Sequence, residues 1–246
     1  MKKEVQKIKK LKILEKRLSS RNKKRIAKVF LELEKKILKD NGEKYDLKTI
    51  VSIDFEWLYK KLKEEMEILY FYTFEETLKG FQNMYKKKLT EKVIKGIRDS
   101  FLKKWNQQNA AKQATRMTNT TKKILNRIIT NGQEAGISHR EMVSQIRNSV
   151  KAMSEQRAST IARTETSKSV NTTSFETSKQ IGMKEKCWIH VGGKKMYRQH
   201  HKELHGKWIK IDEKYKLKDG IEANYPHEEN LPASEVVRCS CLVIFR

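Results

Sequence analysis

The 246-residue sequence predicts an α+β protein with a mostly helical N-terminal two-thirds and a small α+β C-terminal module ending in a β-strand. Both prolines, Pro226 and Pro232, lie near the C-terminus, so the preceding chain can form long helices. Apolar residues recur there at steps of three and four, as on one face of a helix. After Gly182 this spacing gives way to short β-type runs.

Four helical segments are predicted before residue 132. The first has apolar stripes at Ile8–Leu18 and Ile26–Ile37, and Asp40-Asn41-Gly42 supplies a turn and a stop. The others cover about 53–88, 91–107 and 110–132. The run 53–88 is apolar around more of its circumference, so we expect it to be the most buried. The polar stretch 106–121 is either a frayed helix or a linker.

Two capped helices are predicted next. Ser138 and Glu141 form a capping box that starts a helix reaching about Met153. Ser154 is expected to cap a second helix that runs to about Ile181 and ends at Gly182. Its apolar residues are small and few, so this helix is expected to pack closely against other elements.

The module after Gly182 contains short strands and turns. Strands are predicted at 187–191 and 208–211 and over the C-terminal run 236–245, with a turn at Gly192-Gly193. A short His-rich helix or turn is expected at 196–205, and a loop from Pro226 to Pro232. We therefore divide the sequence into a basic helical region, 1–130, and a C-terminal module, 135–246.

Charge is the strongest compositional feature. The 55 Lys and Arg against 30 Asp and Glu give a formal net charge of +25. Residues 1–40 and 81–130 carry +11 each, whereas 41–80 carry −3. Such an excess favours a polyanionic partner, and double-stranded DNA bound through phosphates is the expected one. A solvated Lys-rich surface is the alternative. The expected DNA contacts are Lys9, Lys10, Lys16, Arg17, Lys23, Lys24, Arg25, Lys86, Lys87, Lys88, Lys103 and Lys104.

Several protein classes are not expected. Three cysteines are too few for a disulfide scaffold, which favours a reducing compartment. No run of about 18 apolar residues predicts a membrane-spanning helix. The basic N-terminus lacks the apolar stretch of a secretory signal.

Histidines and cysteines suggest a metal site in the module. Cys239 and Cys241, two apart on an expected strand, would point to one face, and His201 and His205 would share one face of a helix. Thiolate and imidazole ligands suit zinc, and a small module would use it structurally. Cys187 and His200 are alternative fourth ligands. The alternative interpretation is that the histidines are hydrogen-bonding residues and the cysteines small core residues.

No catalytic residue is predicted. The sequence has no phosphate-binding glycine loop, dinucleotide fingerprint or H-E-x-x-H motif. A metal-dependent nuclease or toxin-like enzyme using the His/Cys group is the alternative, but only Glu203 and Asp212 are nearby carboxylates.

Short motifs follow one another in a definite order along the C-terminal part. They are Ile161-Ala162-Arg163-Thr164-Glu165, Asn171, Trp188, Arg198-x-x-His201-x-x-Leu204-His205-Gly206, Pro226, Pro232 and Arg238-Cys239-Ser240-Cys241. This order resembles the phage Mu F-like, or head-morphogenesis, family of minor head proteins in tailed bacteriophages. The resemblance marks Arg163, Thr164, Glu165, Asn171, Trp188, Arg198 and Gly206 as family-motif residues. The resemblance covers about 40% of the chain. For the first 130 residues it implies only that the N-terminal region is helical.

The resemblance implies a non-enzymatic minor head protein, made in the bacterial host cytoplasm and carried in the virion. Its implied place is inside the head near the portal vertex, with the portal protein, other head proteins and packaged DNA as partners and no membrane. Some relatives carry cysteines near the positions of Arg198 and His201, which would complete a four-ligand metal site with the Cys-x-Cys pair. Arg198 stands there in this chain, so His205 or Cys187 would have to replace that ligand.

Overall fold

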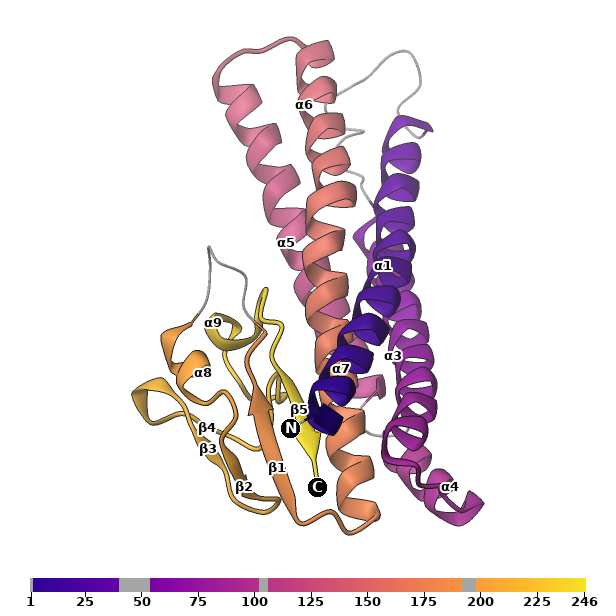
Figure 1. The fold of residues 1–246 in the computed structure, drawn as a ribbon. Coiled ribbons are helices and arrows are strands. Elements are labelled where there is room, and N and C mark those ends of the chain that lie inside the picture. The colour runs from indigo at the N-terminus through magenta and orange to yellow at the C-terminus, as the bar shows by residue number, and fades with distance from the viewer. Residues whose placement is uncertain (1, 40–53, 102–105, 192–197) are drawn as a thin grey trace. The chain divides into compact units, whose positions relative to one another are not determined.

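The computed structural model describes residues 2–39, 54–101, 106–191 and 198–246, and over them the chain is the mostly helical α+β protein that the sequence predicts (Figure 1). It forms two compact units. The first comprises residues 1–22, 69–106 and 160–246, and the second comprises 23–68 and 107–159. Each unit combines segments from distant parts of the sequence, so the units do not coincide with the regions 1–130 and 135–246. The division into those two regions remains a prediction from the sequence.

The predicted N-terminal helices are present. They are α1 (Lys2–Lys39), α3 (Phe55–Tyr85), α4 (Glu91–Ser100) and α5 (Gln107–Glu134). The polar stretch 106–121 is helical from Gln107 onward, and α5 continues past Asn131-Gly132, so that pair does not end it. The expected turn at Asp40-Asn41-Gly42 lies outside the described residues.

The two following helices are joined rather than separated. Ser138 and Glu141 form the predicted capping box of α6 (His139–Ala152). The predicted cap at Ser154 is wrong, because residues Met153–Arg157 form a π-helical turn that continues into α7 (Ala158–Gln180). The Ser154 hydroxyl instead donates to the carbonyl of Lys151. At the other end, Gly182 has a φ of 68°, and the amides of Gly182 and Met183 bond the carbonyls of Lys179 and Ser178, which is a Schellman ending.

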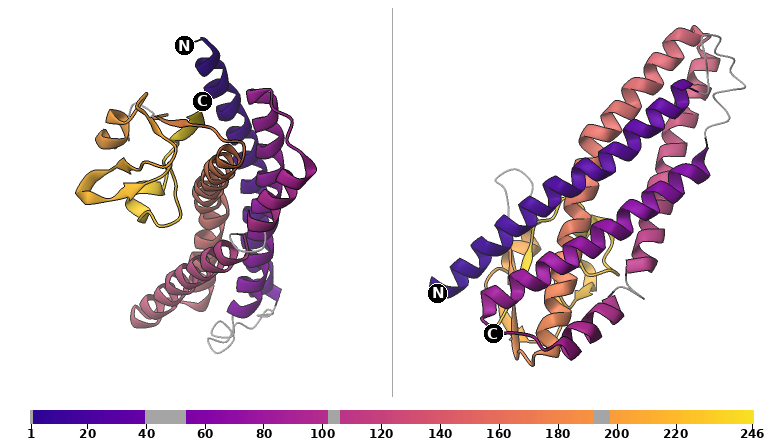
Figure 2. Two further views of the ribbon diagram at one scale, coloured as in Figure 1. Left: turned by 90° about the horizontal axis from the view of Figure 1, so that it is seen from below. Right: turned by 90° about the vertical axis from the view of Figure 1, so that its right-hand side faces the viewer.

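A small antiparallel sheet follows α7. Its strands β1 (Glu185–Ile189), β2 (Trp208–Lys210) and β5 (Leu242–Phe245) lie in the order β2-β1-β5. The C-terminal module also contains a second, two-stranded sheet, formed by β3 (Tyr215–Lys216) and β4 (Glu222–Ala223). It has two short helices, α8 (Gln199–Glu203) and α9 (Ala233–Val236). Figures 1 and 2 show that β5 lies beside α7, with β1 on the opposite side of β5. The predicted turn at Gly192-Gly193 lies outside the described residues.

The predicted strand 236–245 is wrong in its first half. Residues 233–236 are helical, and Arg238 has a φ of 59°, which an extended strand does not permit. Cys239 and Cys241 therefore lie in the connection between α9 and β5 and not on one strand face.

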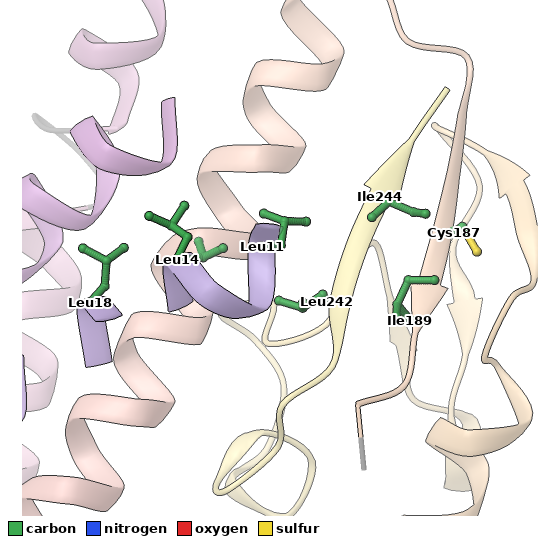
Figure 3. Packing of buried hydrophobic residues seen from close by; sticks show 8 residues of the cluster. Leu11, Leu14, Leu18, Cys187, Ile189, Leu242 and Ile244 are labelled. Carbon is green, nitrogen blue, oxygen red and sulfur yellow. The ribbon is translucent and has the colours of Figure 1, made fainter. Parts of the chain in front are cut away.

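The first unit buries one face of its sheet against α1. Three leucines of α1 pack with Val170 of α7 and with four side chains from β1 and β5 (Figure 3). The residues of this cluster are Leu11, Leu14, Leu18, Val170, Cys187, Ile189, Leu242 and Ile244. The apolar stripe Ile8–Leu18 thus serves as the cover of the sheet, which explains why so basic a helix is ordered here.

The second unit is held by helix contacts of its own. Arg157 donates to the Thr121 hydroxyl at 2.8 Å and to the Met117 carbonyl at 3.0 Å, and its guanidinium faces the Phe30 ring at 5.6 Å. Burial lowers the pKa of Arg157 to about 10. These bonds connect the π-helical turn to α5 and help explain why the chain does not break at Ser154.

Lys186 of β1 is a charged group inside the first unit. Its side chain is fully buried, and its ammonium has no hydrogen-bond partner among the described residues. The ammonium faces the rings of Phe175 at 5.0 Å and Tyr215 at 5.6 Å, which offsets part of the desolvation. Burial lowers the pKa of Lys186 from 10.5 to about 8.

We expect Lys186→Met to stabilise the protein by about 1–3 kcal/mol at pH 7, because a desolvated charge is replaced by an apolar side chain of similar length. The unfolded chain binds the proton more tightly than the folded one between pH 8 and 10.5, so the cost is full below pH 8 and fades as pH rises to 10.5. Urea unfolding of both proteins at pH 7 and at pH 10 measures this difference. The exposed Lys210→Met is the control, and a gap that grows with pH would contradict the prediction.

Candidate metal centre and its supporting residues

Three buried ligand groups meet between α8 and the start of β5. The Nδ1 atom of His201 lies 3.6 Å from the Sγ atoms of both Cys239 and Cys241. The amide of Cys241 donates to Cys239 Sγ at 3.4 Å, and these three residues form a compact group of potential ligands. The Cys-x-Cys pair and His201 therefore converge as the sequence predicts, although through a connecting loop.

The pKa values of the two cysteines are shifted in opposite directions. The Cys241 thiol bonds the Cys239 sulfur, which lowers the pKa of Cys239 and raises that of Cys241. Burial opposes the first shift and adds to the second. His227 further lowers the pKa of Cys239. Cys239 is thus the sulfur that is readier to become a thiolate, the form that binds metal.

The group fits the geometry of one zinc ion. With Zn–S near 2.3 Å and Zn–N near 2.0–2.1 Å in a tetrahedron, a sulfur and a nitrogen ligand lie about 3.6 Å apart. Both His201–cysteine distances have this value. A third such distance, 3.6 Å, joins Cys241 Sγ and His190 Nδ1. Nearby, His227 is 1% exposed, and neither of its ring nitrogens has a hydrogen-bond partner among the described residues.

The other predicted ligands lie elsewhere. His205 is exposed, and its Nδ1 accepts a hydrogen bond from the His190 amide at 3.1 Å. Cys187 belongs to the leucine cluster under α1, and burial raises its pKa to about 11. His200 bonds Glu235 rather than the cysteines.

Three residues near the centre escape sequence reasoning. His190 follows β1, His227 lies in the Pro226–Pro232 loop, and Glu235 lies on α9. Glu235 Oε2 lies 2.8 Å from His200 Nε2 and 2.7 Å from His201 Nε2. Although burial acts to raise the pKa of Glu235, the bonds to these histidines lower it. No spacing rule joins positions 190, 201, 227 and 235, since tertiary folding alone brings them together.

Several family-motif residues support the centre. Arg198, at the start of α8, donates to the carbonyl oxygens of Ser234 and Val237, the second at 3.0 Å. Trp188 is fully buried, and its ring meets that of His201 edge-on at 5.1 Å. Gly206 has a φ of 80°, and its amide bonds the Trp188 carbonyl at 2.9 Å. The left-handed turn there favours glycine and brings α8 back beside β1.

The remaining motif residues lie along α7. Arg163 is exposed and donates to the Ser240 hydroxyl, between the two cysteines. Thr164 is buried. Glu165 is buried too, where it accepts a hydrogen bond from Tyr70 at 2.5 Å and pairs with Lys168 at 3.6 Å.

Asn171 ties α7 to β5 with both ends of its amide. Its Nδ2 donates to the carbonyl of Cys241 at 3.1 Å, and its Oδ1 accepts from the amide of Val243 at 3.0 Å. These are the bonds that a neighbouring strand would make, so Asn171 takes the place of a strand at this edge. It thereby fixes the backbone of a candidate metal ligand.

The comparison with protein families agrees with the motif order. The protein-family model described as "Phage Mu protein F like protein" matches residues 122–244, which is half of the chain. The chain belongs to the phage Mu F-like family. Membership makes it a phage head-related protein and thus a virion component. No curated protein and no solved structure matches it. Among the described residues of this Mu F-like protein, no helix is both long and apolar enough to span a membrane.

Replacement of Asn171 by Ala is expected to destabilise the Mu F-like protein by about 2–4 kcal/mol, since a buried carbonyl and a buried amide lose their partners. Asn171→Asp should do no better, because a carboxylate can accept from Val243 but cannot donate to Cys241. Thermal and urea unfolding measure the loss. Asn83→Ala, at an exposed site on α3 in the same unit, is the control, and equal stability of the Asn83 and Asn171 variants would contradict this role.

Proposed function

We propose that this Mu F-like protein is a minor head protein that lies inside the phage head near the portal vertex, contacts packaged DNA and assists head assembly or DNA delivery. The portal protein and other head proteins are its proposed partners. Family membership supports the head assignment. The observation that supports DNA contact is a set of exposed lysines on α1 and after α3 that have no acidic partner among the described residues.

The predicted DNA-binding residues have different surroundings. Lys9, Lys10, Lys16, Lys23, Lys24, Lys86, Lys87 and Lys88 are exposed, and none has an ion-pair partner within the described part of the chain. Arg17 pairs with Glu76 and Arg25 with Glu65, each at 2.6 Å, so these two are partly neutralised. Lys103 and Lys104 lie outside the described residues. The unpaired lysines are therefore the better candidates for phosphate contacts.

Duplex DNA should bind the protein with little sequence preference and with an affinity that falls steeply as salt rises. Replacement of Lys9, Lys10 and Lys16 by Gln should weaken binding and flatten the plot of log affinity against log salt by up to about 0.9 per lost phosphate contact. Fluorescence anisotropy with unrelated duplexes at several salt concentrations measures both effects.

The control replaces Lys60, Lys61 and Lys63, which are paired with acidic residues on α3. This variant removes the same charge and should bind like the wild type. Absence of binding at low salt, or equal losses in the two triple variants, would refute the assignment to α1.

The proposal includes one structural zinc ion held by His201, Cys239 and Cys241. Such an ion would crosslink α8 to the loop before β5 and stabilise a small sheet. The alternative of a metal-dependent nuclease has little support here. Among the described residues of the candidate centre the one carboxylate is that of Glu235, and it already bonds two histidines.

Purified protein is expected to carry about one zinc per chain, and removal by a chelator should lower the melting temperature. Double replacement of Cys239 and Cys241 by Ser should abolish binding, whereas His205→Ala should not. Elemental analysis and calorimetric zinc titration measure this. Retention of zinc in the double variant would contradict the site, and loss of zinc in His205→Ala would restore the ligand set predicted from the sequence.

Plasmid incubation with divalent metals tests the enzyme alternative. We expect no cutting by the wild-type protein. Metal-dependent cutting that disappears in His201→Ala would establish the nuclease instead.

A further inference from the structure

Glu235 occupies a position that determines the chemical state of His201. Its carboxylate is buried, with 6% of the residue exposed, and one oxygen lies 2.7 Å from His201 Nε2. An ionised carboxylate has only acceptor sites, so Nε2 of His201 must carry the hydrogen of this bond. A neutral imidazole has one ring hydrogen, which leaves Nδ1 with a free lone pair. That atom is the one facing both cysteine sulfurs.

We propose that Glu235 is a positioning residue that holds His201 in the Nε2–H tautomer and aims its Nδ1 at Cys239 and Cys241. The three ligand groups are then arranged before any metal arrives. A carboxylate behind a metal-binding histidine also raises the basicity of the ligand. The inference concerns this chain's own residues and rests on the zinc site of the proposed function.

Neighbouring residues hold the side chains of Glu235 and His201 in position relative to each other. Arg198 bonds the carbonyls of Ser234 and Val237, so it fastens α9 on both sides of Glu235 to the start of α8. The Trp188 ring packs edge-on against the His201 ring and so also restricts its position. Arg198 is thus a support for the carboxylate and not a ligand. His200 bonds the same Glu235 oxygen and helps to hold it in place.

The first experiment reads the tautomer without metal. Long-range ¹H–¹⁵N correlation spectra of the full chain in the presence of a chelator distinguish a protonated Nε2 from a protonated Nδ1. His201 should be the Nε2–H tautomer in the wild type and a mixture in Glu235→Ala. Glu235→Gln should restore it, since an amide oxygen still accepts from Nε2. Unchanged His201 nitrogen shifts in Glu235→Ala, or a wild-type Nδ1–H tautomer, would overturn the proposal.

The second experiment uses Co²⁺ alone as a probe of the ligand set. Its visible spectrum reports tetrahedral coordination and bound thiolate. Glu235→Ala should bind Co²⁺ about 10–100-fold more weakly, the usual effect of losing such a partner. Glu235→Gln should recover most of that loss. Glu213→Ala, an exposed carboxylate in the same module, should match the wild type in both experiments.

The outcomes separate the two ideas. If wild-type protein binds no Co²⁺ or Zn²⁺, the zinc site fails, and the tautomer spectra still decide the role of Glu235. If the wild type binds Co²⁺ and Glu235→Ala binds it equally well with the same spectrum, Glu235 does not position His201. If the Glu235→Ala variant unfolds without metal, the Glu235→Gln variant decides the question. Loss of the Nε2–H tautomer in Glu235→Gln would then refute the hydrogen-bond argument.

Discussion

The free edge of β5 is the constraint on which the first unit depends. In the order β2-β1-β5 this strand has a partner on one side only, and unpaired backbone groups inside a protein are costly. Side chains from three helices close the other side. Asn171 of α7 bonds Cys241 and Val243, Tyr85 of α3 accepts from the Phe245 amide at 2.9 Å, and Lys7 of α1 donates to the Phe245 carbonyl at 3.1 Å. The helices and the sheet are thus joined by hydrogen bonds between helix side chains and the backbone of β5, as well as by apolar contact.

Polar contacts also hold the helices of that unit to one another. All but one of residues 164–178 in α7 are buried, yet few are large and apolar. Asn22 of α1 donates to Thr166 of α7 at 2.9 Å and to Thr73 of α3 at 3.3 Å. Glu15 of α1 is buried, accepts a hydrogen bond from Ser167, and has its pKa raised by burial. Such directed bonds favour one helix register over its neighbours, which an apolar seam alone specifies less sharply.

Local patterns could be predicted from the sequence, and long-range ones could not. Apolar spacing predicted the helices, and Ser138 with Glu141 predicted one helix start, because these signals act within a few residues. Ser154 failed as a cap because Arg157 and its partners Thr121 and Met117 keep the chain helical there. Cys239 and Cys241 do lie beside His201, but a turn at Arg238 and not strand alternation brings them there. Glu235, His190 and His227 have no signature in spacing.

The interleaved units impose an order on biosynthesis. Every segment of the second unit precedes residue 160, so it can fold while the ribosome is still adding the rest. The first unit needs β5, and the bond between Lys7 and Phe245 spans 238 positions. The apolar face of α1 that covers the sheet therefore stays uncovered until β5 has been synthesised. During that interval its dense positive charge would discourage nascent chains from associating with one another.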